Sequence, residues 1–367
     1  MKKLLFILLS FLLFASKAEA SHIVSSDLTY ECLGGLNYKV TLKLYRDCGG
    51  IAMGAFQIVK YKSDSCSSSG NLLMTLDTTY EVSQVCDSML PLTRCNSGTL
   101  PGIEVYIFTT TVTLSGYCPD WIFSYDECCR STAIANLSPG YRFYTHTTLN
   151  NKGGKCNDSP IFNAIPILYS CVNEQINYNN LVYDKEGDSL SFKLIQTKSL
   201  ATLNVPYSNV AYNPQNPFAN VGGVTLDSLT GQMSFKSSTI QQVISTVLIT
   251  EFDTLGNVKG THIRDLEFIF IICPPPPFNP YTTGVNYDTL DYHYRGCYNT
   301  PFCFDVRSIS FDTASPMELN YYGNIPGATF TTTVSNDTTY GQFCWTPDSN
   351  DIGNFFFQIE AVAKTCP

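Results

Sequence analysis

Three carboxylates in one short segment of the sequence could hold a metal ion. Asp184, Glu186 and Asp188 occupy alternate positions around Gly187, a residue that permits a tight turn. Oxygen ligands at alternate positions of a loop are typical of sites for the hard cation Ca²⁺. An EF-hand loop would also need a bidentate Glu further along, and the matching position is Ile195. The segment therefore raises the hypothesis of a calcium site that is not an EF-hand.

The alternative is a solvated turn between two strands, where Asp and Gly are common for conformational reasons. The stretch from Leu181 to Leu194 has the pattern of a strand, this acidic turn and a second strand. A weaker copy runs from Ser310 to Tyr322, where Asp312 is kept but Ala314 and Pro316 replace the other acids. Three carboxylates also fall short of the roughly 6–8 ligands that Ca²⁺ takes. We therefore expect a fold that does not require metal, with calcium as an addition.

The first twenty residues carry an export signal. Lys2 and Lys3 precede an apolar run from Leu4 to Phe14, and Ala18-Glu19-Ala20 forms an A-x-A cleavage site. The run is shorter than the about 20 residues that span a bilayer, and no later run is long enough for a transmembrane segment. We expect a secreted, extracellular or cell-surface protein whose mature chain begins at Ser21.

Fifteen cysteines in an exported chain favour disulfides over a zinc cluster, because the compartment is oxidising and no C-x-x-C pair occurs. The odd count leaves at least one thiol unpaired or bonded to another molecule. Adjacent cysteines rarely reach disulfide geometry. We therefore expect Cys128 and Cys129 to bond to different partners.

Catalytic chemistry finds little support in the sequence. The four histidines form no H-E-x-x-H motif, and no G-x-S-x-G nucleophile elbow is present. A Cys–His pair would need a free thiol, which an oxidising compartment removes. A carboxylate pair for glycoside hydrolysis depends on long-range geometry that the sequence does not give. We expect a non-catalytic protein.

Charge and composition narrow the class of partner. Cleavage of the signal removes three lysines and one glutamate, so the formal net charge moves from -9 to about -11. Such a chain lacks the basic face that nucleic acid requires. Only 14% of residues are charged, while Ser, Thr, Asn and Tyr are abundant, as in many extracellular β proteins. Surface glycans or proteins are the partners we expect.

Period-two alternation of apolar and polar residues predicts an all-β fold. In the stretch from Asn37 to Asp47, Tyr38, Val40, Leu42 and Leu44 alternate with polar residues. This strand and the segment before it predict a hairpin. Other strands are expected at Phe56 to Tyr61, Ile103 to Leu114, Trp121 to Tyr125, Tyr141 to Thr148, Val243 to Phe252, Ile263 to Ile272, Cys303 to Phe311, Thr329 to Val334 and Phe355 to Ala363.

Polar and proline-rich stretches divide the chain. The segment from Asn150 to Pro160 is rich in turn residues, and Pro274 to Pro277 predicts a stiff polyproline linker. The expected parts are a signal peptide (1–20), a Cys-rich β domain (21–158), a β-sandwich (159–273), a linker (274–280) and a second sandwich (281–367).

An internal repeat indicates that the two sandwiches are related. The segment from Asp227 to Phe235 aligns without a gap with the segment from Asp337 to Trp345. Both parts also open near a cysteine and end in Cys-Pro. This parallel predicts one disulfide from the first strand to the last in each sandwich. The expected pairs are Cys171 with Cys273 and Cys303 with Cys366.

A series of short motifs runs in order through residues 22–273. They are His22-Ile23-Val24, Asp27 to Gly34, Tyr38 to Leu42, Leu44 to Cys48, Cys128-Cys129-Arg130, Ser159 to Asn163 and Tyr183 to Leu190. Together they resemble the gliding-motility-associated, PKD-domain-containing surface proteins of Bacteroidota, in which the last motif usually reads DPDGDSL. The resemblance implies Ig-like or PKD-like sandwiches, type IX secretion and no catalytic residues. Those proteins end in a sorting domain, which is absent here, so we expect a fragment.

These observations predict tandem Ig-like or PKD-like β-sandwich domains with disulfides. The expected role is adhesion, or spacing within a larger surface adhesin. The alternative is an extracellular glycan-binding or glycan-processing accessory module, which exposed tyrosines and Trp121 on one concave face would favour. Tyr is also an ordinary strand residue, so its abundance alone does not decide between the two.

Overall fold

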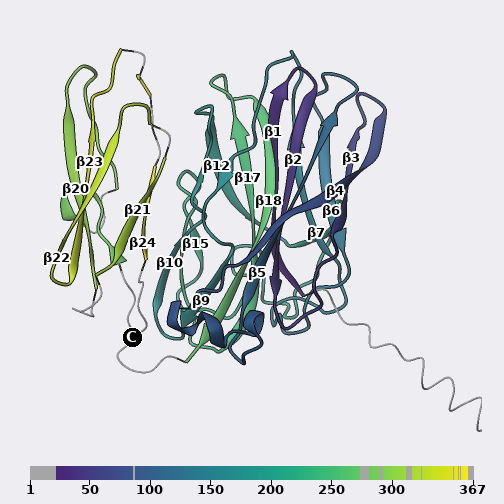
Figure 1. The fold of residues 1–367 in the computed structure, drawn as a ribbon, viewed down its shortest axis with the longest axis horizontal. Helices are drawn as coiled ribbons and strands as arrows, with labels where there is room; N and C mark the ends of the chain where they lie inside the picture. Colours follow the sequence, from purple (N-terminus) through teal and green to yellow (C-terminus); the bar gives the residue numbers. More distant parts are fainter. Residues whose placement is uncertain are drawn as a thin grey trace, which may run out of the picture.

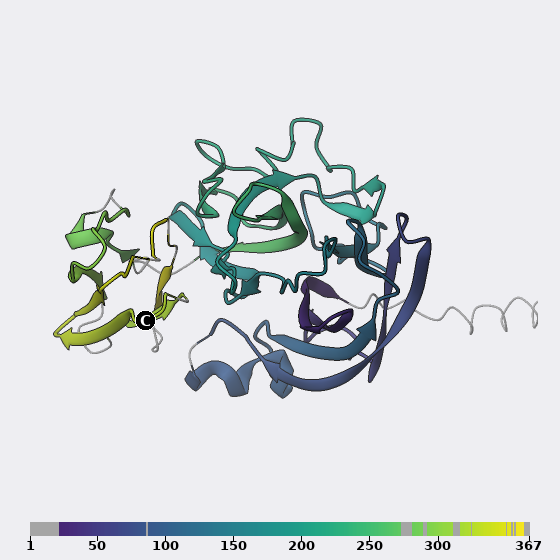
Figure 2. The ribbon, with the colours of Figure 1, turned by 90° about the horizontal axis from the view of Figure 1, so that it is seen from above.

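The computed structural model describes residues 22–85, 87–272, 281–288, 292–310, 316–323, 325–349, 351–353, 355 and 357–362. These residues form strands and three short 3₁₀ helices, and they gather into three groups (Figures 1 and 2). The predicted all-β fold with disulfides is confirmed. The expected signal peptide and linker lie outside the described residues.

The first group is a curled antiparallel sheet in the order β1-β2-β5-β4-β3-β6-β7. Its strands are β1 (Ile23–Gly34), β2 (Asn37–Asp47), β3 (Phe56–Ser63), β4 (Ser68–Glu81), β5 (Ile103–Thr113), β6 (Trp121–Glu127) and β7 (Phe143–Leu149), with η1 (Asp87–Leu92) and η2 (Arg94–Asn96) after β4. The predicted hairpin is β1–β2. The alternating residues Tyr38, Val40, Leu42 and Leu44 of β2 are all fully buried in the core, which is why this pattern forms one face of a sheet.

The second group packs two sheets face to face. Its strands are β8 (Ile161–Phe162), β9 (Ile167–Cys171), β10 (Gln175–Asn179), β11 (Val182–Tyr183), β12 (Ser189–Ile195), β13 (Lys198–Leu200), β14 (Leu203–Asn204), β15 (Thr225–Leu226), β16 (Gln232–Lys236), β17 (Gln241–Phe252) and β18 (Val258–Ile271). Strands β10-β16-β15 lie over β12-β17-β18, and their facing side chains form a separate apolar core. Ring contacts such as Phe235 with Phe268, at 4.6 Å between centroids, fill this core.

The sheet does not break between the first and second groups. Strand β7 pairs antiparallel with β18, so that Thr147 lies opposite His262 and Leu149 opposite Gly260. The order β1-β2-β5-β4-β3-β6-β7-β18-β17-β12 is therefore one continuous path. Two large apolar cores lie on either side of residue 158, but smaller apolar clusters and the backbone pairing run across it, so the predicted boundary there stays a prediction.

A buried ion pair fastens the two groups at this junction. Arg264 on β18 donates from Nε to Asp27 Oδ1 of β1 at 2.7 Å and from Nη2 to Asp27 Oδ2 at 3.2 Å. Tyr45 donates its hydroxyl to the same carboxylate at 2.9 Å, and Arg264 Nη1 donates to the carbonyl of Asn180 at 3.2 Å. Arg264 and Asp27 are only 1% and 3% exposed. Each charge therefore depends on the other for stabilisation.

A second buried ion pair involves the next residue of β18, Asp265. Arg130, in the connection between β6 and β7, reaches Asp265 at 2.6 Å. Thr246 of β17 donates its hydroxyl to the other Asp265 oxygen at 2.6 Å. The guanidinium of Arg130 also lies 4.9 Å from the centre of the Phe143 ring. The first group is thus held to β18 at two places by fully desolvated charges.

The third group is a smaller sandwich beside the second (Figure 1). Its elements are β19 (Tyr281–Thr282), η3 (Val285–Tyr287), β20 (Phe302–Ile309), β21 (Glu318–Tyr322), β22 (Thr329–Ser335), β23 (Thr338–Trp345) and β24 (Gln358–Val362). The sheet β19-β20-β23-β22 faces the pair β21-β24 across a third apolar core. The side chain of Tyr322 packs against the second core, and Gln358 donates to Asn179 at 2.8 Å.

The sequence repeat corresponds to a repeated pairing of strands. In the second group Ile176 of β10 lies opposite Phe235 of β16. In the third group Phe302 of β20 lies opposite Trp345 of β23, the residue aligned with Phe235. Phe235 and Trp345 are both buried in their cores. The aligned segments therefore play the same packing role in the two sandwiches.

Replacing Asp27 by Asn tests the junction. The change leaves the Arg264 charge buried without its counter-ion, and we expect the free energy of unfolding to fall by about 3–5 kcal/mol. Urea unfolding measures it. The matched control is Lys60→Met, which breaks the partly exposed pair with Asp126 and should cost no more than about 1 kcal/mol. Equal losses in the two variants would contradict a special role for the buried pair.

Buried histidines at the junction predict acid sensitivity. Burial, reinforced by neighbouring His146, lowers the pKa of His262 to about 3, whereas an unfolded histidine titrates near about 6.5. The neutral ring is favoured in the fold, so its contribution is present above pH 6.5 and is lost as the pH falls toward 3. Between about pH 6.5 and 5, unfolding free energy should drop more steeply in the parent than in His262→Gln. The exposed His293→Gln variant should follow the parent.

Candidate functional site

The acidic turn connects β11 to β12 and is stabilised by its own first carboxylate. Asp184 Oδ1 accepts the backbone N–H of Glu186 at 3.0 Å and that of Asp188 at 2.9 Å. Gly187 has a φ of 83°, in the left-handed region that glycine adopts without strain. The conformation of the turn is therefore explained by local hydrogen bonds, as the solvated-turn alternative predicts.

Two of the three predicted ligands come together with a third acid from a distant strand. Oxygens of Asp184, Asp188 and Glu251 all lie within 4.8 Å of one another. We call these three residues the acidic cluster. Glu186, which the sequence grouped with Asp184 and Asp188, instead accepts the backbone N–H of Asp158 at 3.1 Å. The structure thus puts Glu251 of β17 in the place expected for Glu186.

The pairing of strands brings Glu251 to the turn. In the β12–β17 ladder Leu190 lies opposite Glu251, which places Glu251 next to the start of β12. On β17 it shares the inward face with Val247 and Ile249, both fully buried. A glutamate on the buried face of an apolar strand was a signal present in the sequence. Its neighbours could not be read there, because they depend on strand register.

Glu251 is a buried acid whose charge is only weakly compensated by its neighbours. It is 0% exposed, and neither of its carboxylate oxygens has a hydrogen-bond partner among the described residues. Burial, with the Asp184 carboxylate as the next cause, raises the pKa of Glu251 to about 9, against the opposing effects of Asn157 and Lys259. Burial also raises the pKa of Asp184, whose Oδ2 is likewise unpartnered in the described part of the chain.

Lys259 neutralises only part of the negative charge of the acidic cluster, because it lies close to Asp188 and further from Glu251. Its Nζ lies 2.5 Å from Asp188 Oδ2 but 4.0 Å from Glu251 Oε1. A cavity of about 230 Å³ reaches Asp188 and Lys259 from the surface, with the β17–β18 turn on its rim. A second cavity, near Cys128, has a volume of about 210 Å³. Both are smaller than the about 300–1,000 Å³ of small-molecule pockets.

Two of the predicted cysteine arrangements are wrong. Cys128 and Cys129 are bonded to each other, although we expected different partners. Cys303 is bonded to Cys344 and not to Cys366, because these two residues lie directly opposite in the β20–β23 ladder, with Cα atoms 4.2 Å apart. Strand register, which the Cys-Pro parallel did not contain, decides this pair.

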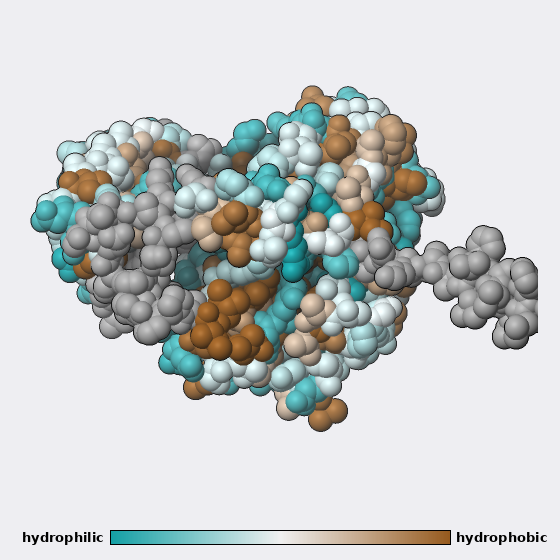
Figure 3. Space-filling model, turned by 60° about the horizontal axis from the view of Figure 1, so that its bottom comes forward, coloured by the Kyte–Doolittle hydropathy of each residue, from teal (hydrophilic) through white to brown (hydrophobic). Residues whose placement is uncertain are grey.

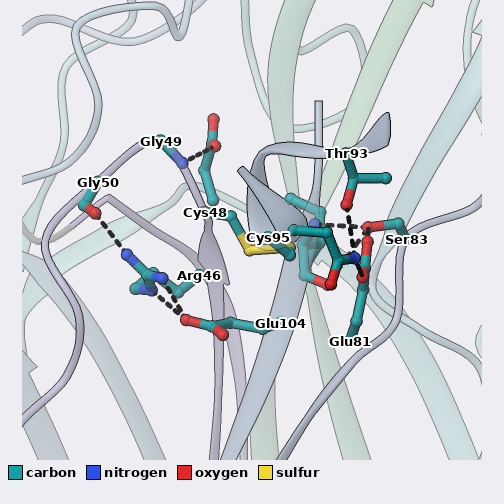
Figure 4. Close-up of a disulfide and its surroundings, with 12 residues drawn as sticks. Arg46, Cys48, Gly49, Gly50, Glu81, Ser83, Thr93, Cys95 and Glu104 are labelled. Carbon is teal, nitrogen blue, oxygen red and sulfur yellow. Dashed lines mark hydrogen bonds and ion pairs between the residues drawn. A yellow bond between two sulfur atoms is a disulfide. The ribbon is translucent and has the colours of Figure 1, made fainter. Parts of the chain in front are cut away.

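Other cysteines tie loops to the first sheet. Cys48 at the end of β2 is bonded to Cys95 in η2, beside the ion pair of Arg46 with Glu104 (Figure 4). The remaining pairs here are Cys32 with Cys156 and Cys66 with Cys118. Cys171 is disulfide-bonded, and its expected partner Cys273 lies outside the described residues, as does Cys366. Among the described cysteines Cys297 is free and exposed, in keeping with the odd count.

Trp121 does not lie on the surface, so it does not line the concave aromatic face that would favour the glycan-module alternative. Trp121 is 0% exposed and packs inside the first core. Tyr292 and Tyr298 are exposed, at 65% and 57%, while Tyr294 stacks on Phe302 with 4.6 Å between ring centroids. Exposed tyrosines also occur in the first group, at Tyr80 and Tyr117, whereas Trp121 is enclosed in the core of that group.

Comparisons with known proteins do not identify a family for this chain, so its fold is described from its own geometry. No protein-family model and no curated protein matches the chain. Among solved structures, Dpr2 Ig1-Ig2 in complex with DIP-Theta Ig1-Ig3 is 6% identical over 92% of this chain and 98% of that chain, with a TM-score of 0.17. A marsupial T cell receptor is 9% identical over 92% and 98%, with a TM-score of 0.20. The N-terminal eight Ig domains of Down Syndrome Cell Adhesion Molecule are 9% identical over 92% and 41%, with a TM-score of 0.18. TM-scores this low do not establish a shared fold.

The fold and its cysteines define the class of protein. It is an all-β protein of packed, curled sheets with disulfides, and such disulfides are typical of extracellular proteins. Within the part of the chain that is described, no helix has the length and apolar character needed to cross a membrane.

Disulfide mapping tests the cysteine assignments. Mass spectrometry of the non-reduced, protease-digested mature protein should find the pairs of the structure, including a bond within the single peptide that carries Cys128 and Cys129. Cys303 and Cys344 should be recovered as one cross-linked pair. Thiol labelling without reduction should modify Cys297. Recovery of Cys303 linked to Cys366 would restore the pairing that the sequence predicts.

Proposed function

We propose that this chain is an exported, non-catalytic cell-surface protein that acts in adhesion or as a rigid spacer within a larger adhesin. The observation that carries the proposal is the junction between the first two groups. One continuous sheet and two buried ion pairs cross it, so it offers no hinge. A stalk must transmit force between its parts, and backbone ladders fastened by desolvated charges suit that task.

The resemblance to gliding-motility-associated surface proteins of Bacteroidota supports the same assignment. Several of the residues that carry the resemblance build this junction or its surroundings. Asp27 and Tyr45 hold Arg264, Arg130 of the Cys-Cys-Arg motif holds Asp265, and Asp184 belongs to the acidic cluster. In this proposal those motifs specify a rigid surface module with Ig-like or PKD-like sandwiches, exported by type IX secretion.

A non-catalytic role agrees with the environment of the histidines. His146 and His262 lie inside the junction, where burial lowers the pKa values to about 4 and 3. The hydroxyl of Thr147 is 2.6 Å from His262 Nδ1, and this contact joins β7 to β18. These rings are thus packing groups with no route to a substrate through the two cavities described above.

The outer surface offers contacts for protein partners. Phe56, Ile58 and Leu73 of the β3–β4 hairpin are 59%, 54% and 58% exposed, and Ile58 lies directly opposite Leu73. Figure 3 shows apolar side chains gathered in several areas among polar ones on the face it displays. Exposed apolar side chains on the outer face of a sheet fit a protein surface better than a sugar, which needs polar groups around an aromatic platform.

Binding assays separate adhesion from the glycan-module alternative. If the chain acts in adhesion, the mature protein should bind intact cells or extracted surface proteins. If it is only a spacer, it should bind neither. In both cases it should give no signal on a glycan array, with or without chelator. Reproducible binding of one glycan class would overturn the proposal in favour of the accessory module. The double variant Phe56→Ser/Leu73→Ser tests the exposed apolar side chains of the β3–β4 hairpin. It should reduce binding to a protein partner, while circular dichroism shows that the fold is intact.

A further inference from the structure

We propose that Asp184, Asp188 and Glu251 form a binding site for one divalent cation, with Ca²⁺ as the ion that their chemistry favours. Acidic side chains often lie near one another at a protein surface without a bound ion, but one member of this cluster is enclosed in the protein. Glu251 is fully buried, one of its carboxylate oxygens lies within 4.8 Å of oxygens of Asp184 and Asp188, and neither of its oxygens has a hydrogen-bond partner among the described residues. A buried carboxylate without donors is costly unless a cation or a proton compensates it.

The charges of the cluster call for two positive charges. Three carboxylates face one ammonium group, that of Lys259, which leaves two negative charges in excess when all three acids are ionised. Lys259 lies against Asp188 and is too far from Glu251 Oε1 for a hydrogen bond. One divalent ion would balance the remainder.

The free oxygens converge from two elements. Asp184 uses Oδ1 to hold the turn, which leaves Oδ2 unpartnered in the described structure, while Glu251 offers both Oε1 and Oε2. The turn carries two ligands and β17 the third, so a bound ion would link the β11–β12 turn to the β17–β18 hairpin. Water entering through the adjoining cavity of about 230 Å³ can fill other coordination positions.

A glycine keeps the space beside Glu251 open. Gly260 lies opposite Glu251 in the β17–β18 ladder. A Cβ at this position would come within 2.8 Å of the Tyr30 hydroxyl and 3.3 Å of Glu251 Oε2. The strand thus lacks a side chain where one would press on the Glu251 carboxylate.

The donor set selects the class of metal. All three ligands are carboxylates, which suit hard cations, and the cluster contains none of the thiolates or imidazoles that favour zinc or copper. Carboxylates from a turn and a strand form an irregular arrangement. Ca²⁺ accepts variable geometry, whereas Mg²⁺ demands a near-octahedral shell and keeps most of its water.

Calorimetric titration tests the site. Mature protein dialysed against EDTA and then buffer should bind one Ca²⁺ with a dissociation constant of about 10⁻⁴–10⁻³ M, the range of extracellular modules. Its melting temperature should rise with CaCl₂ and rise less with MgCl₂ at the same concentration. Asp184→Asn and Glu251→Gln should each weaken binding by about tenfold or more, since each removes a charged ligand but keeps an oxygen acceptor.

Glu186→Gln is the matched control, because it changes an acid of the same turn that lies outside the cluster. It should bind Ca²⁺ as the parent does. Lys259→Met should bind Ca²⁺ more tightly, since it removes the competing ammonium. Absence of heat and of any melting shift in the parent at about 10 mM Ca²⁺, above the expected range, would overturn the site. Equal losses in Glu186→Gln and Glu251→Gln would overturn the assignment of ligands.

Discussion

The pairing of Arg264 with Asp27 is the interaction on which the rest of the structure depends. It places a guanidinium from β18 against β1, two strands that are far apart along the sheet path. Because the pair is almost completely buried, its geometry must be maintained whenever the protein is folded. The first sheet curls so that β1 returns to β18 (Figure 2), and the ion pair holds the two strands together there. The junction is thereby closed on both sides, by the β7–β18 ladder and by the ion pair.

Strand β18 connects this junction to the acidic cluster. One part of it carries Arg264 and Asp265, which hold the first group, while its beginning carries Lys259 beside Asp188. Strand β17 runs alongside and supplies both Thr246, which supports Asp265, and Glu251. The same hairpin thus forms the rigid junction and one wall of the acidic cluster. A change in the charge of the cluster would act directly on the hairpin that fastens the first two groups.

Local patterns in the sequence predicted most strands and little of their pairing. The expected strand from Ile103 to Leu114 is β5, that from Val243 to Phe252 lies within β17, and the predicted hairpin is β1–β2. Alternation suffices for these because it reports which face of a strand is buried. It does not report neighbours, so the placement of β7 beside β18 could not be foreseen. The domain limits drawn from turn residues remain a prediction. The two large apolar cores separate the first two groups, whereas one continuous sheet joins them.

The candidate site shows the same division between local and long-range information. Asp184 and Asp188 could be chosen from sequence because their spacing and Gly187 define a turn, and that turn makes its own hydrogen bonds. Glu186 has the same spacing but faces Asp158, because alternate positions in a turn do not share a face as they do in a strand. Glu251 lies beside the turn because of the register between β12 and β17. In the same way, Cys344 lies opposite Cys303 because of the register between β20 and β23. In both cases the missing partner is a cross-strand neighbour. Charged or sulfur-bearing residues on buried strand faces are therefore the positions where the register of this fold decides the chemistry.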